Sequence, residues 1–342
     1  FMSGTSLDGV DAACLLTDGV DICEFGPSVY RPYSAAERQM IQGVLGKWPG
    51  APGLEPVSKL IMAAHLEAWS QLPPAALIGF HGQTLCHDPQ NSRTHQLGSG
   101  SELARRAGTA VAWDFRSEDV GCGGQGAPLA PIFHWALARY KQIEEPMAIV
   151  NLGGVGNLTW IDARLPAEQG LLAFDTGPAN APLNDFMMKT TGHPYDVGGA
   201  LAASGRVDEE LVALFLQRPY FSRSAPKSLD RDSFSDMVEL VAQLAPADAA
   251  ATLTALCVAA IEAALPLIPV QPKQVWISGG GRKNIEIMRQ LAMKLPMKVY
   301  DIDDIGLDGD MLEAQAFAYQ GDTIVAVGDA SIRARLLAFR EA

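Results

Sequence analysis

Short apolar runs recur along this chain, and glycine, aspartate or asparagine follows most of them. The opening part has such a run over 12–17, then Asp18-Gly19, a dipeptide that favours a tight hairpin, and then an extended segment over 21–30. This order predicts an antiparallel meander. Further runs of strand length lie over 76–80, 109–113, 147–151, 157–162, 171–174, 273–278 and 299–302.

Segments with helical periodicity separate these strands. Ser34 and Glu37 have the spacing of a capping box, which predicts a helix from there to about residue 46. Strands that alternate with helices indicate the α/β class. Apolar positions at helical spacing predict further helices over 54–72, 101–107, 128–143, 181–190, 207–216, 249–267, 284–295 and 309–319.

The plan of the opening hairpin returns in the second half of the chain. The turn Gly153-Gly154-Val155-Gly156 joins two apolar strands, as the opening turn does. We interpret this as a structural duplication. The predicted boundary lies near 141–146, which gives an N-terminal domain over 1–143 and a C-terminal domain over 144–342. Phe1-Met2 has the character of the end of a strand whose beginning lies outside this sequence.

Composition and charge narrow the class of protein. The chain has 342 residues, 48% of them hydrophobic, which is enough for the cores of two domains. A net charge of −13 argues against nucleic acid or an anionic membrane surface as a partner. The 5 cysteines include no CxxC pair, which is typical of reduced thiols. With no predicted signal peptide or membrane span, we expect a cytoplasmic protein.

Two glycine-and-aspartate turns carry the candidate chemistry. The first is the segment 4–11, and the second is the segment 175–180, after an apolar run. Such turns let backbone N–H groups approach phosphates, and their carboxylates suit a divalent metal or proton abstraction. One such turn alone is weak, because glycine and aspartate are ordinary turn residues. Two of them with a third turn over 279–281 favour a nucleotide held in a cleft between paired domains.

This order resembles the superfamily of sugar kinases, hexokinase, actin and Hsp70 chaperones, in which two related domains clasp ATP. At the level of one family, the chain resembles anhydro-N-acetylmuramic acid kinase from residue 2 to about residue 320. Leu229-Asp230 departs from the family's Thr-Gly pair, and the tail after Gly321 departs from its ending. The matching segments are Gly4-Thr5-Ser6-Leu7-Asp8-Gly9-Val10-Asp11, His81-Gly82-Gln83-Thr84, Asp114-Phe115-Arg116, Gly123-Gly124-Gln125-Gly126-Ala127-Pro128-Leu129, Asn151-Leu152-Gly153-Gly154, Phe174-Asp175-Thr176-Gly177-Pro178, Pro226-Lys227-Ser228 and Gly279-Gly280-Gly281.

The resemblance implies a fold and an activity. The fold is α/β, with two duplicated actin-like (ribonuclease H-like) domains, each a mixed sheet flanked by helices, and an ATP cleft between them. The activity is a kinase of peptidoglycan recycling, which converts 1,6-anhydro-N-acetylmuramic acid, ATP and water to N-acetylmuramic acid 6-phosphate and ADP. Because an internal acetal opens as O6 is phosphorylated, a base must activate water near the anomeric carbon.

The resemblance also implies site residues. Asp8 is expected to hold Mg²⁺ directly or through water, although an Asx turn before Gly9 would use the same residue. Asp175 is expected to be the base, although a helix N-cap is an alternative. The residues expected to bind ATP are Gly4, Thr5, Ser6, Leu7, Asp8, Gly9, Val10, Asp11, Gly153, Gly154, Thr176, Gly177, Gly279, Gly280 and Gly281.

The sugar is expected to contact His81, Gln83, Arg116 and Gln125. A guanidinium suits the lactyl carboxylate of a muramic sugar, although Arg116 has an alternative salt bridge to Asp114 or Glu118. His81 has a structural alternative, and Gln125 lies in a glycine loop that suits a hinge equally. The remaining histidines lack metal-ligand spacing, which argues against zinc.

Alternative functions remain open at this point. They are a kinase for another carbohydrate, and a non-catalytic nucleotide or sugar sensor on the same scaffold. Retention of Asp8 and Asp175 disfavours the sensor. For the kinase we expect an amino sugar as the small-molecule partner, no nucleic acid, no membrane, and a homodimer.

Overall fold

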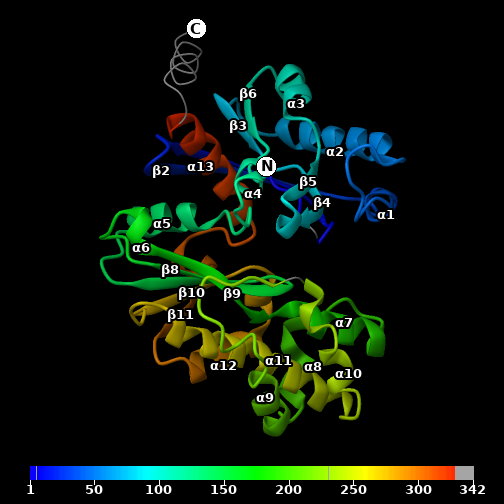
Figure 1. Cartoon of the computed structure of the whole chain (residues 1–342), viewed down its shortest axis with the longest axis vertical. Coiled ribbons are helices and arrows are strands. Elements are labelled where there is room, and N and C mark those ends of the chain that lie inside the picture. Colours follow the sequence, from blue (N-terminus) through cyan, green and yellow to red (C-terminus); the bar gives the residue numbers. More distant parts are fainter. Residues whose placement is uncertain (5, 230, 328–342) are drawn as a thin grey trace. The chain divides into compact units, whose positions relative to one another are not determined.

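The computed structural model describes residues 1–4, 6–229 and 231–327, without the side chains of 231, 232 and 322–327 (Figure 1). Thr5, which we expected to bind phosphate, lies outside the described residues, as do Asp230 and most of the tail after Gly321. The α/β class is confirmed, since helices flank sheets throughout the described chain.

The chain divides into two units. Unit 1 comprises Phe1–Tyr140 and the chain from Met311 onward, and unit 2 comprises Lys141–Asp310. Unit 2 thus begins at Lys141, the first residue of the 141–146 segment. We expected a second domain over 144–342, but α13 (Leu312–Val327) packs against β1 (Gly9–Thr17) and β3 (Leu77–Phe80) of unit 1. A side chain at Gly79 of β3 would collide with the carbonyl oxygen of Phe317, so glycine is what lets this helix lie so close.

The described residues of unit 1 form three separate pairs of strands. In the antiparallel hairpin of β1 and β2, Asp11 lies opposite Tyr30. In the parallel pair of β3 and β6, Ile78 lies opposite Val111. The hairpin of β4 and β5 was not predicted, because its residues are mostly polar and form no apolar run. The strands are β1 (Gly9–Thr17), β2 (Ile22–Pro32), β3 (Leu77–Phe80), β4 (Gln83–Asp88), β5 (Arg93–Leu97) and β6 (Ala110–Trp113).

Helices cover these strands and form the core of unit 1. Val10 and Ala12 of β1 pack with Ile61 and Met62 of α2, all of them fully buried. The predicted capping box is confirmed, because Ser34 caps α1 and Glu37 reaches back to its backbone. The helices are α1 (Ala35–Gln42), α2 (Leu54–Trp69), α3 (Gly100–Ala107), α4 (Ser117–Gly121), α5 (Pro131–Tyr140) and α13.

Unit 2 is built on a 5-stranded mixed sheet in the order β11-β10-β7-β8-β9 (Figure 1). The central strand β7 runs antiparallel to β8 and parallel to β10. A bulge in β9 opposite Gly156 and Asn157 accommodates Thr176 as an extra residue. The strands are β7 (Met147–Leu152), β8 (Val155–Ile161), β9 (Leu171–Pro178), β10 (Gln274–Ser278) and β11 (Lys298–Asp301).

One apolar helix organises the core of unit 2. The segment Pro246–Leu267 is long and apolar enough to cross a membrane, but 78% of its most apolar stretch is buried inside the protein, which is typical of a core helix. Its first part is α11, and Val258 and Ile261 pack against the sheet. The helices of this unit are α6 (Ala167–Gly170), α7 (Asn180–Thr191), α8 (Ala200–Ser204), α9 (Glu209–Leu216), α10 (Met237–Leu240), α11 (Pro246–Ala264) and α12 (Ile285–Lys294).

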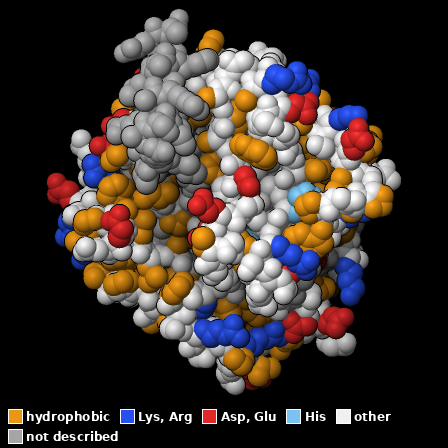
Figure 2. All heavy atoms as spheres, turned by 45° about the horizontal axis from the view of Figure 1, so that its top comes forward, with side chains coloured by type: hydrophobic (Ala, Val, Ile, Leu, Met, Phe, Trp, Pro, Cys, Tyr) orange, Lys and Arg blue, Asp and Glu red, His pale blue; other side chains and the backbone are white. Residues whose placement is uncertain are grey.

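Charged side chains pair locally on the surface. Figure 2 shows one face on which Lys and Arg side chains lie in small groups, several of them beside Asp or Glu. Among the described ion pairs are Arg31 with Glu37 at 2.8 Å in unit 1 and Arg282 with Asp310 at 2.9 Å in unit 2. Arg282 is buried and also binds Asp303, so Asp303 and Asp310 belong to a structural ion-pair network around this arginine.

Candidate active site

The segment Gly4–Asp11 forms a tight turn that ends in β1. The amide of Leu7 donates to the carbonyl of Gly4 at 3.2 Å, and the side chain of Leu7 anchors the turn in the core of unit 1. Ser6 and Asp8 point outward and are exposed. The turn thus presents a hydroxyl and a carboxylate to solvent on a buried hydrophobic anchor.

The carboxylate of Asp8 is oriented by its neighbours. Its Oδ1 accepts from Ser6 Oγ at 2.6 Å and from the amide of Gly9 at 3.1 Å. The Asx-type contact that the sequence left open is therefore present, and it leaves Oδ2 without a hydrogen bond to any residue that the structure describes. Those residues contain no group of three or more potential metal-binding side chains. A single carboxylate fits Mg²⁺, which takes its other ligands from phosphates and water.

His81 and Arg116 form a linked pair in unit 1. Nδ1 of His81 donates to the carbonyl of Gly82 at 2.8 Å, since a carbonyl can only accept. The neutral ring therefore has its lone pair on Nε2, which accepts from Nε of Arg116 at 3.0 Å. Burial, reinforced by the nearby guanidinium, lowers the pKa of His81 to about 3. Both ring nitrogens are thus used inside the protein.

Arg116 is held in place while part of its guanidinium stays available. Nη1 donates to the carbonyl of Gly126, and no acceptor among the described residues binds Nη2. The expected alternative, a salt bridge to Asp114 or Glu118, is not among the described ion pairs, and Asp114 accepts a hydrogen bond from Ser117 Oγ instead. Burial lowers the pKa of Arg116 to about 10, so the group remains charged at neutral pH.

Glu313, in the first turn of α13, is an acidic residue that sequence reasoning did not consider. Part of its side chain is exposed to solvent. Desolvation by the surrounding protein nevertheless raises the pKa of its carboxyl group. The positive charge of Arg116 opposes this shift, and the negative charge of Asp8 adds to it. These effects place Glu313 within electrostatic reach of both residues. In the sequence, Glu313 is only an acidic residue near the start of the last predicted helix. Acidic residues are common at helix starts, so its position alone does not indicate an interaction with Arg116 or Asp8.

The two glutamines expected at the sugar site differ in environment. Gln83 is fully buried, its Nε2 donates to the carbonyl of Gly4 at 3.1 Å, and its Oε1 has no hydrogen-bond partner among the described residues. Gln83 thereby braces the Gly4 turn. The side chain of Gln125 is exposed, and its carbonyl accepts from Nε2 of His87 at 2.9 Å. Asp119 accepts from the amide of Gly126, so the glycine loop is tied down on both sides of Gln125.

In unit 2 the glycine turns gather at one end of the sheet. Asn180, at the start of α7, donates through Nδ2 to the carbonyl of Leu152 at 2.7 Å and through its amide to Gly153 at 2.9 Å. Gly279 has a φ of +75°, and a Cβ there would lie 2.1 Å from Oδ1 of Asn151. The structure therefore brings the 153–154 turn beside the 279–281 turn, at the carboxyl ends of β7 and β10.

Asp175 lies within β9, three residues before its end, and several neighbours fix it. Its Oδ2 accepts from the amide of Leu229 at 2.8 Å, and its amide donates to Lys227 at 2.9 Å. The hydroxyl of Tyr220 donates to the carbonyl of Asp175 at 2.5 Å. The N-cap alternative is wrong, because Ala179 is the N-cap of α7. The rigid strand and these contacts together preorganise one carboxylate.

Known proteins of one kinase family are similar to this chain over most of its length. A family model described as anhydro-N-acetylmuramic acid kinase matches residues 1–332. Anhydro-N-acetylmuramic acid kinase 1 of Jannaschia sp. (strain CCS1) is 50% identical over 321 residues, which is 93% of this chain and 86% of that protein. Anhydro-N-acetylmuramic acid kinase of Ruegeria sp. (strain TM1040) is 51% identical over 321 residues, with 93% and 85% covered.

Similarity to solved structures is more distant. Component A of (R)-2-hydroxyglutaryl-CoA dehydratase from Acidaminococcus fermentans is 12% identical with a TM-score of 0.43, covering 94% of this chain and 96% of that one. A ROK family glucokinase from Streptomyces griseus is 13% identical with a TM-score of 0.42, covering 95% and 98%. The sequence relatives therefore decide the assignment, and the chain belongs to the anhydro-N-acetylmuramic acid kinase family.

Proposed function

We propose that this protein phosphorylates 1,6-anhydro-N-acetylmuramic acid with ATP and opens its anhydro ring with water. The chain belongs to this family. The structural observation that supports the proposal is the carboxylate of Asp175, which is held in place by a hydrogen bond from the amide of Leu229. A general base must be rigid and correctly aimed before the substrate arrives, and three hydrogen bonds to Asp175 or its backbone meet that need.

Apart from one proton transfer, the reaction makes two bonds and breaks two. Water attacks the anomeric carbon and gives a proton to Asp175, while the bond between that carbon and O6 breaks. O6 then forms a bond to the γ-phosphorus, and the bond from phosphorus to ADP breaks. The products are N-acetylmuramic acid 6-phosphate and ADP, so atoms balance with one water consumed.

Arg116 is our candidate for recognition of the lactyl carboxylate. Its Nη2 has no partner among the described side chains, and its pKa of about 10 keeps it cationic. A half-buried guanidinium with donors to spare is suited to a carboxylate in a charge-assisted pair. His81 then acts as a positioning residue, because its Nε2 accepts from Arg116 and its Nδ1 donates to the carbonyl of Gly82.

ATP is expected at the glycine turns of each unit. The Gly4–Asp11 turn offers backbone amides, Ser6 and Asp8, and the turns of unit 2 offer Gly153, Gly177 and the 279–281 segment. When bound, Mg²⁺ would neutralise phosphate charge, and Asp8 is the residue that suits it. We expect the reaction in the cytoplasm and the protein as a homodimer.

A coupled ADP-release assay tests the function. Rapid release with the anhydro-muramic sugar and slow release with anhydro-glucosamine or plain hexose would support it. Equal or faster release with a hexose would favour a kinase for another carbohydrate. Binding of ATP or sugar without ADP release would favour a sensor on the same scaffold.

A further inference from the structure

His87 lies on β4 and binds the glycine loop that contains Gln125. Its Nε2 lies 2.9 Å from the carbonyl oxygen of Gln125, and its Nδ1 lies 3.0 Å from the hydroxyl of Thr94 on β5. A carbonyl can only accept, so Nε2 carries a proton and donates the hydrogen bond. The imidazole therefore joins the β4–β5 hairpin to a backbone carbonyl that lies 38 positions later in the chain.

Close packing holds the glycine loop beside His87. The amide of Gly126 donates to the carboxylate of Asp119 at 2.6 Å, and the amide of Gly124 donates to the carbonyl of Asp119 at 2.7 Å. Gly126 has a φ of +60°, and a Cβ there would lie 2.6 Å from Val120 and 3.2 Å from the ring of His87. Glycine at this position therefore lets the loop approach the imidazole.

The same loop holds the guanidinium of Arg116. The carbonyl of Gly126 accepts from Nη1 of Arg116, and the preceding carbonyl, that of Gln125, accepts from His87. Nε of Arg116 donates to His81, which lies just before β4. The segment that runs from His81 through β4 to His87 therefore holds Arg116 twice, directly through His81 and indirectly through the glycine loop.

The indirect connection passes through one planar peptide unit. The carbonyl of Gln125 and the amide of Gly126 belong to the same peptide bond, so His87 and Asp119 bind opposite sides of one plane. A glycine-rich backbone has many accessible conformations, and two contacts on one plane remove its freedom to rotate. If the contact with His87 is lost, this plane can turn, and the next carbonyl, which Arg116 binds, turns with it.

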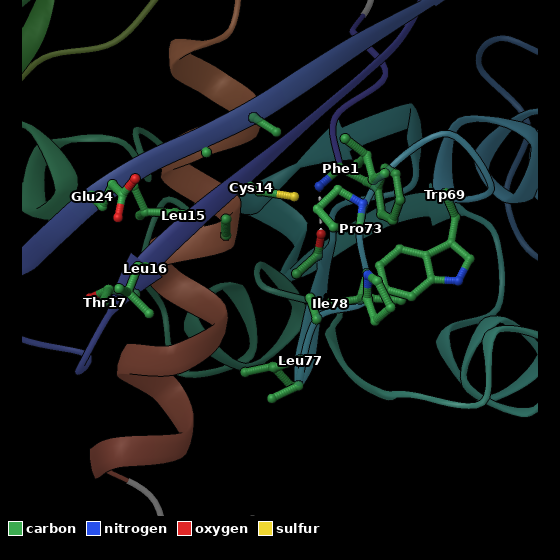
Figure 3. Close-up of a pocket in the computed structure, with 18 residues that line it drawn as sticks. Phe1, Cys14, Leu15, Leu16, Thr17, Glu24, Trp69, Pro73, Leu77 and Ile78 are labelled. Atoms are coloured by element: carbon green, nitrogen blue, oxygen red, sulfur yellow. Dashed lines mark hydrogen bonds between the residues drawn. The ribbon is translucent and has the colours of Figure 1, made fainter. Parts of the chain in front are cut away.

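The cavity in Figure 3 is a less suitable place for a carboxylate in unit 1. It has a volume of about 420 Å³ and lies beside β1 and β3. Glu24 is the one charged side chain among the described residues that line it, and most of the others are apolar, as Leu15 and Leu77 are. A carboxylate there would meet a negative charge and no cationic side chain. This difference favours Arg116, with the loop that holds it, as the place where unit 1 binds an anionic group.

We propose that His87 is a positioning residue for recognition of the substrate's carboxylate. It fixes the peptide plane between Gln125 and Gly126, and through the carbonyl of Gly126 it sets the direction of the Arg116 guanidinium. This inference rests on the proposed function, because it takes Arg116 as the residue that binds the lactyl carboxylate. A guanidinium that is already aimed loses less conformational freedom when the carboxylate binds, so the contribution of His87 is to the affinity for the sugar.

Two amide side chains separate the functions of the two ring nitrogens. In His87→Gln the amide nitrogen can reach the carbonyl of Gln125, whereas in His87→Asn the shorter side chain reaches only toward Thr94. His87→Asn should raise KM for the muramic sugar by about 5- to 30-fold, and His87→Gln should recover most of this loss. The values of kcat, of KM for ATP and of KM for an analogue without the lactyl group should stay within about twofold. His95→Ala is the matched control, because His95 of the same hairpin also binds a backbone carbonyl, that of Lys47.

A double-mutant cycle with Arg116→Ala tests whether the effect passes through Arg116. If it does, His87→Asn should change KM by no more than about twofold in a chain that already carries Arg116→Ala. A full additional rise in KM for the muramic sugar would overturn the proposal. An equal rise for both sugars in His87→Asn would also overturn it and leave His87 with a structural role.

Hydrogen exchange gives a readout that does not depend on the reaction. Without ligands, His87→Asn should speed exchange of the Gly126 amide by at least about tenfold, and His87→Gln should leave it near the original rate. Unchanged exchange in His87→Asn, with an effect of Arg116→Ala that is selective for the muramic sugar, would overturn this inference alone. An equal effect of Arg116→Ala on both sugars would overturn the proposed recognition of the carboxylate and this inference with it.

Discussion

The carboxylate of Asp175 accepts a hydrogen bond at 2.8 Å from the amide of Leu229, which lies 54 positions later in the chain. The position of Leu229 departs from the family pattern, but the contact uses the backbone and any side chain except proline would permit it. The loop can therefore vary in sequence and still aim the carboxylate. This relationship explains how the departure is compatible with a functional site.

Asp175→Asn removes basicity while it keeps shape and hydrogen-bonding capacity. We expect turnover to fall by roughly 10²–10⁴ with ATP affinity unchanged. In H₂¹⁸O the unmodified protein should place the label at the anomeric oxygen and not in phosphate. Tyr220→Phe is a matched control, since it removes only the hydrogen bond to the carbonyl of Asp175 and should cost much less. Near-normal turnover of Asp175→Asn would move the base elsewhere.

Arg116→Ala should raise KM for the muramic sugar by roughly 10- to 100-fold, which corresponds to the loss of about 1.5–3 kcal/mol from a charge-assisted pair. KM for an analogue without the lactyl group should change little. Arg93→Ala is a control, because that arginine pairs with Asp88 on the surface. An equal rise for both sugars would leave Arg116 with a structural role only.

His81→Phe should raise KM for the sugar and leave KM for ATP unchanged, because Arg116 loses the acceptor that orients it. His81→Gln offers an amide oxygen as a replacement acceptor and should recover part of the loss. With a pKa of about 3, His81 stays neutral from pH 5 to pH 9, and protonation would begin only well below that range. KM for the sugar should therefore show no step near pH 6.5, and a clear step there would contradict this assignment.

Gly279→Ala should weaken ATP binding and lower stability together. The new Cβ would meet Asn151, and the backbone conformation (φ +75°, ψ 175°), which is essentially confined to glycine, adds a penalty of about 1–3 kcal/mol. We expect the Kd for ATP to rise by roughly tenfold or more. Gly192→Ala is the control, because it has a similar φ of +74° and open space around a new Cβ but is not among the residues expected to bind ATP. Calorimetry with both variants checks this, and unchanged ATP affinity in Gly279→Ala would remove the turn from the nucleotide site.

Glu37→Gln tests an ion pair that links β2 to α1. The hydrogen bond from Arg31 lowers the pKa of Glu37 to about 2, against an ordinary 4.5. Because the folded pKa is depressed, this stabilisation is present above pH 4.5 and is lost as the pH falls toward 2. The variant should be less stable by on the order of 2 kcal/mol at pH 7, and the difference should shrink near pH 3. If the loss of stability in Glu37→Gln were the same at every pH, it would not come from the ion pair. Glu55→Gln, which removes an ion pair on the exposed surface, is the control.

The sequence predicted most of the framework because apolar periodicity reports burial. The helix 54–72 corresponds to α2, and the apolar run over 273–278 corresponds to β10. The hairpin of β4 and β5 was missed because its polar residues carry no such signal. The helix over 309–319 was predicted as an element, but its assignment to unit 1 depends on contacts between distant segments, which periodicity does not encode.

The sequence predicted those site residues that lie in recognisable motifs. The motifs identified Arg116 and His81 separately, but only the structure shows that one orients the other. Glu313 had no motif and was found through its electrostatic relation to Arg116 and Asp8. The role of Leu229 is carried by its amide, which the identity of a side chain does not reveal.

The return of α13 to unit 1 has a consequence for biosynthesis. Unit 2 is continuous in sequence from Lys141 to Asp310, so it can fold as soon as that stretch has left the ribosome. Unit 1 must wait for α13, which is made after all of unit 2. During translation the faces of β1 and β3 that α13 covers therefore remain exposed, and this interval is when a chaperone has most to protect.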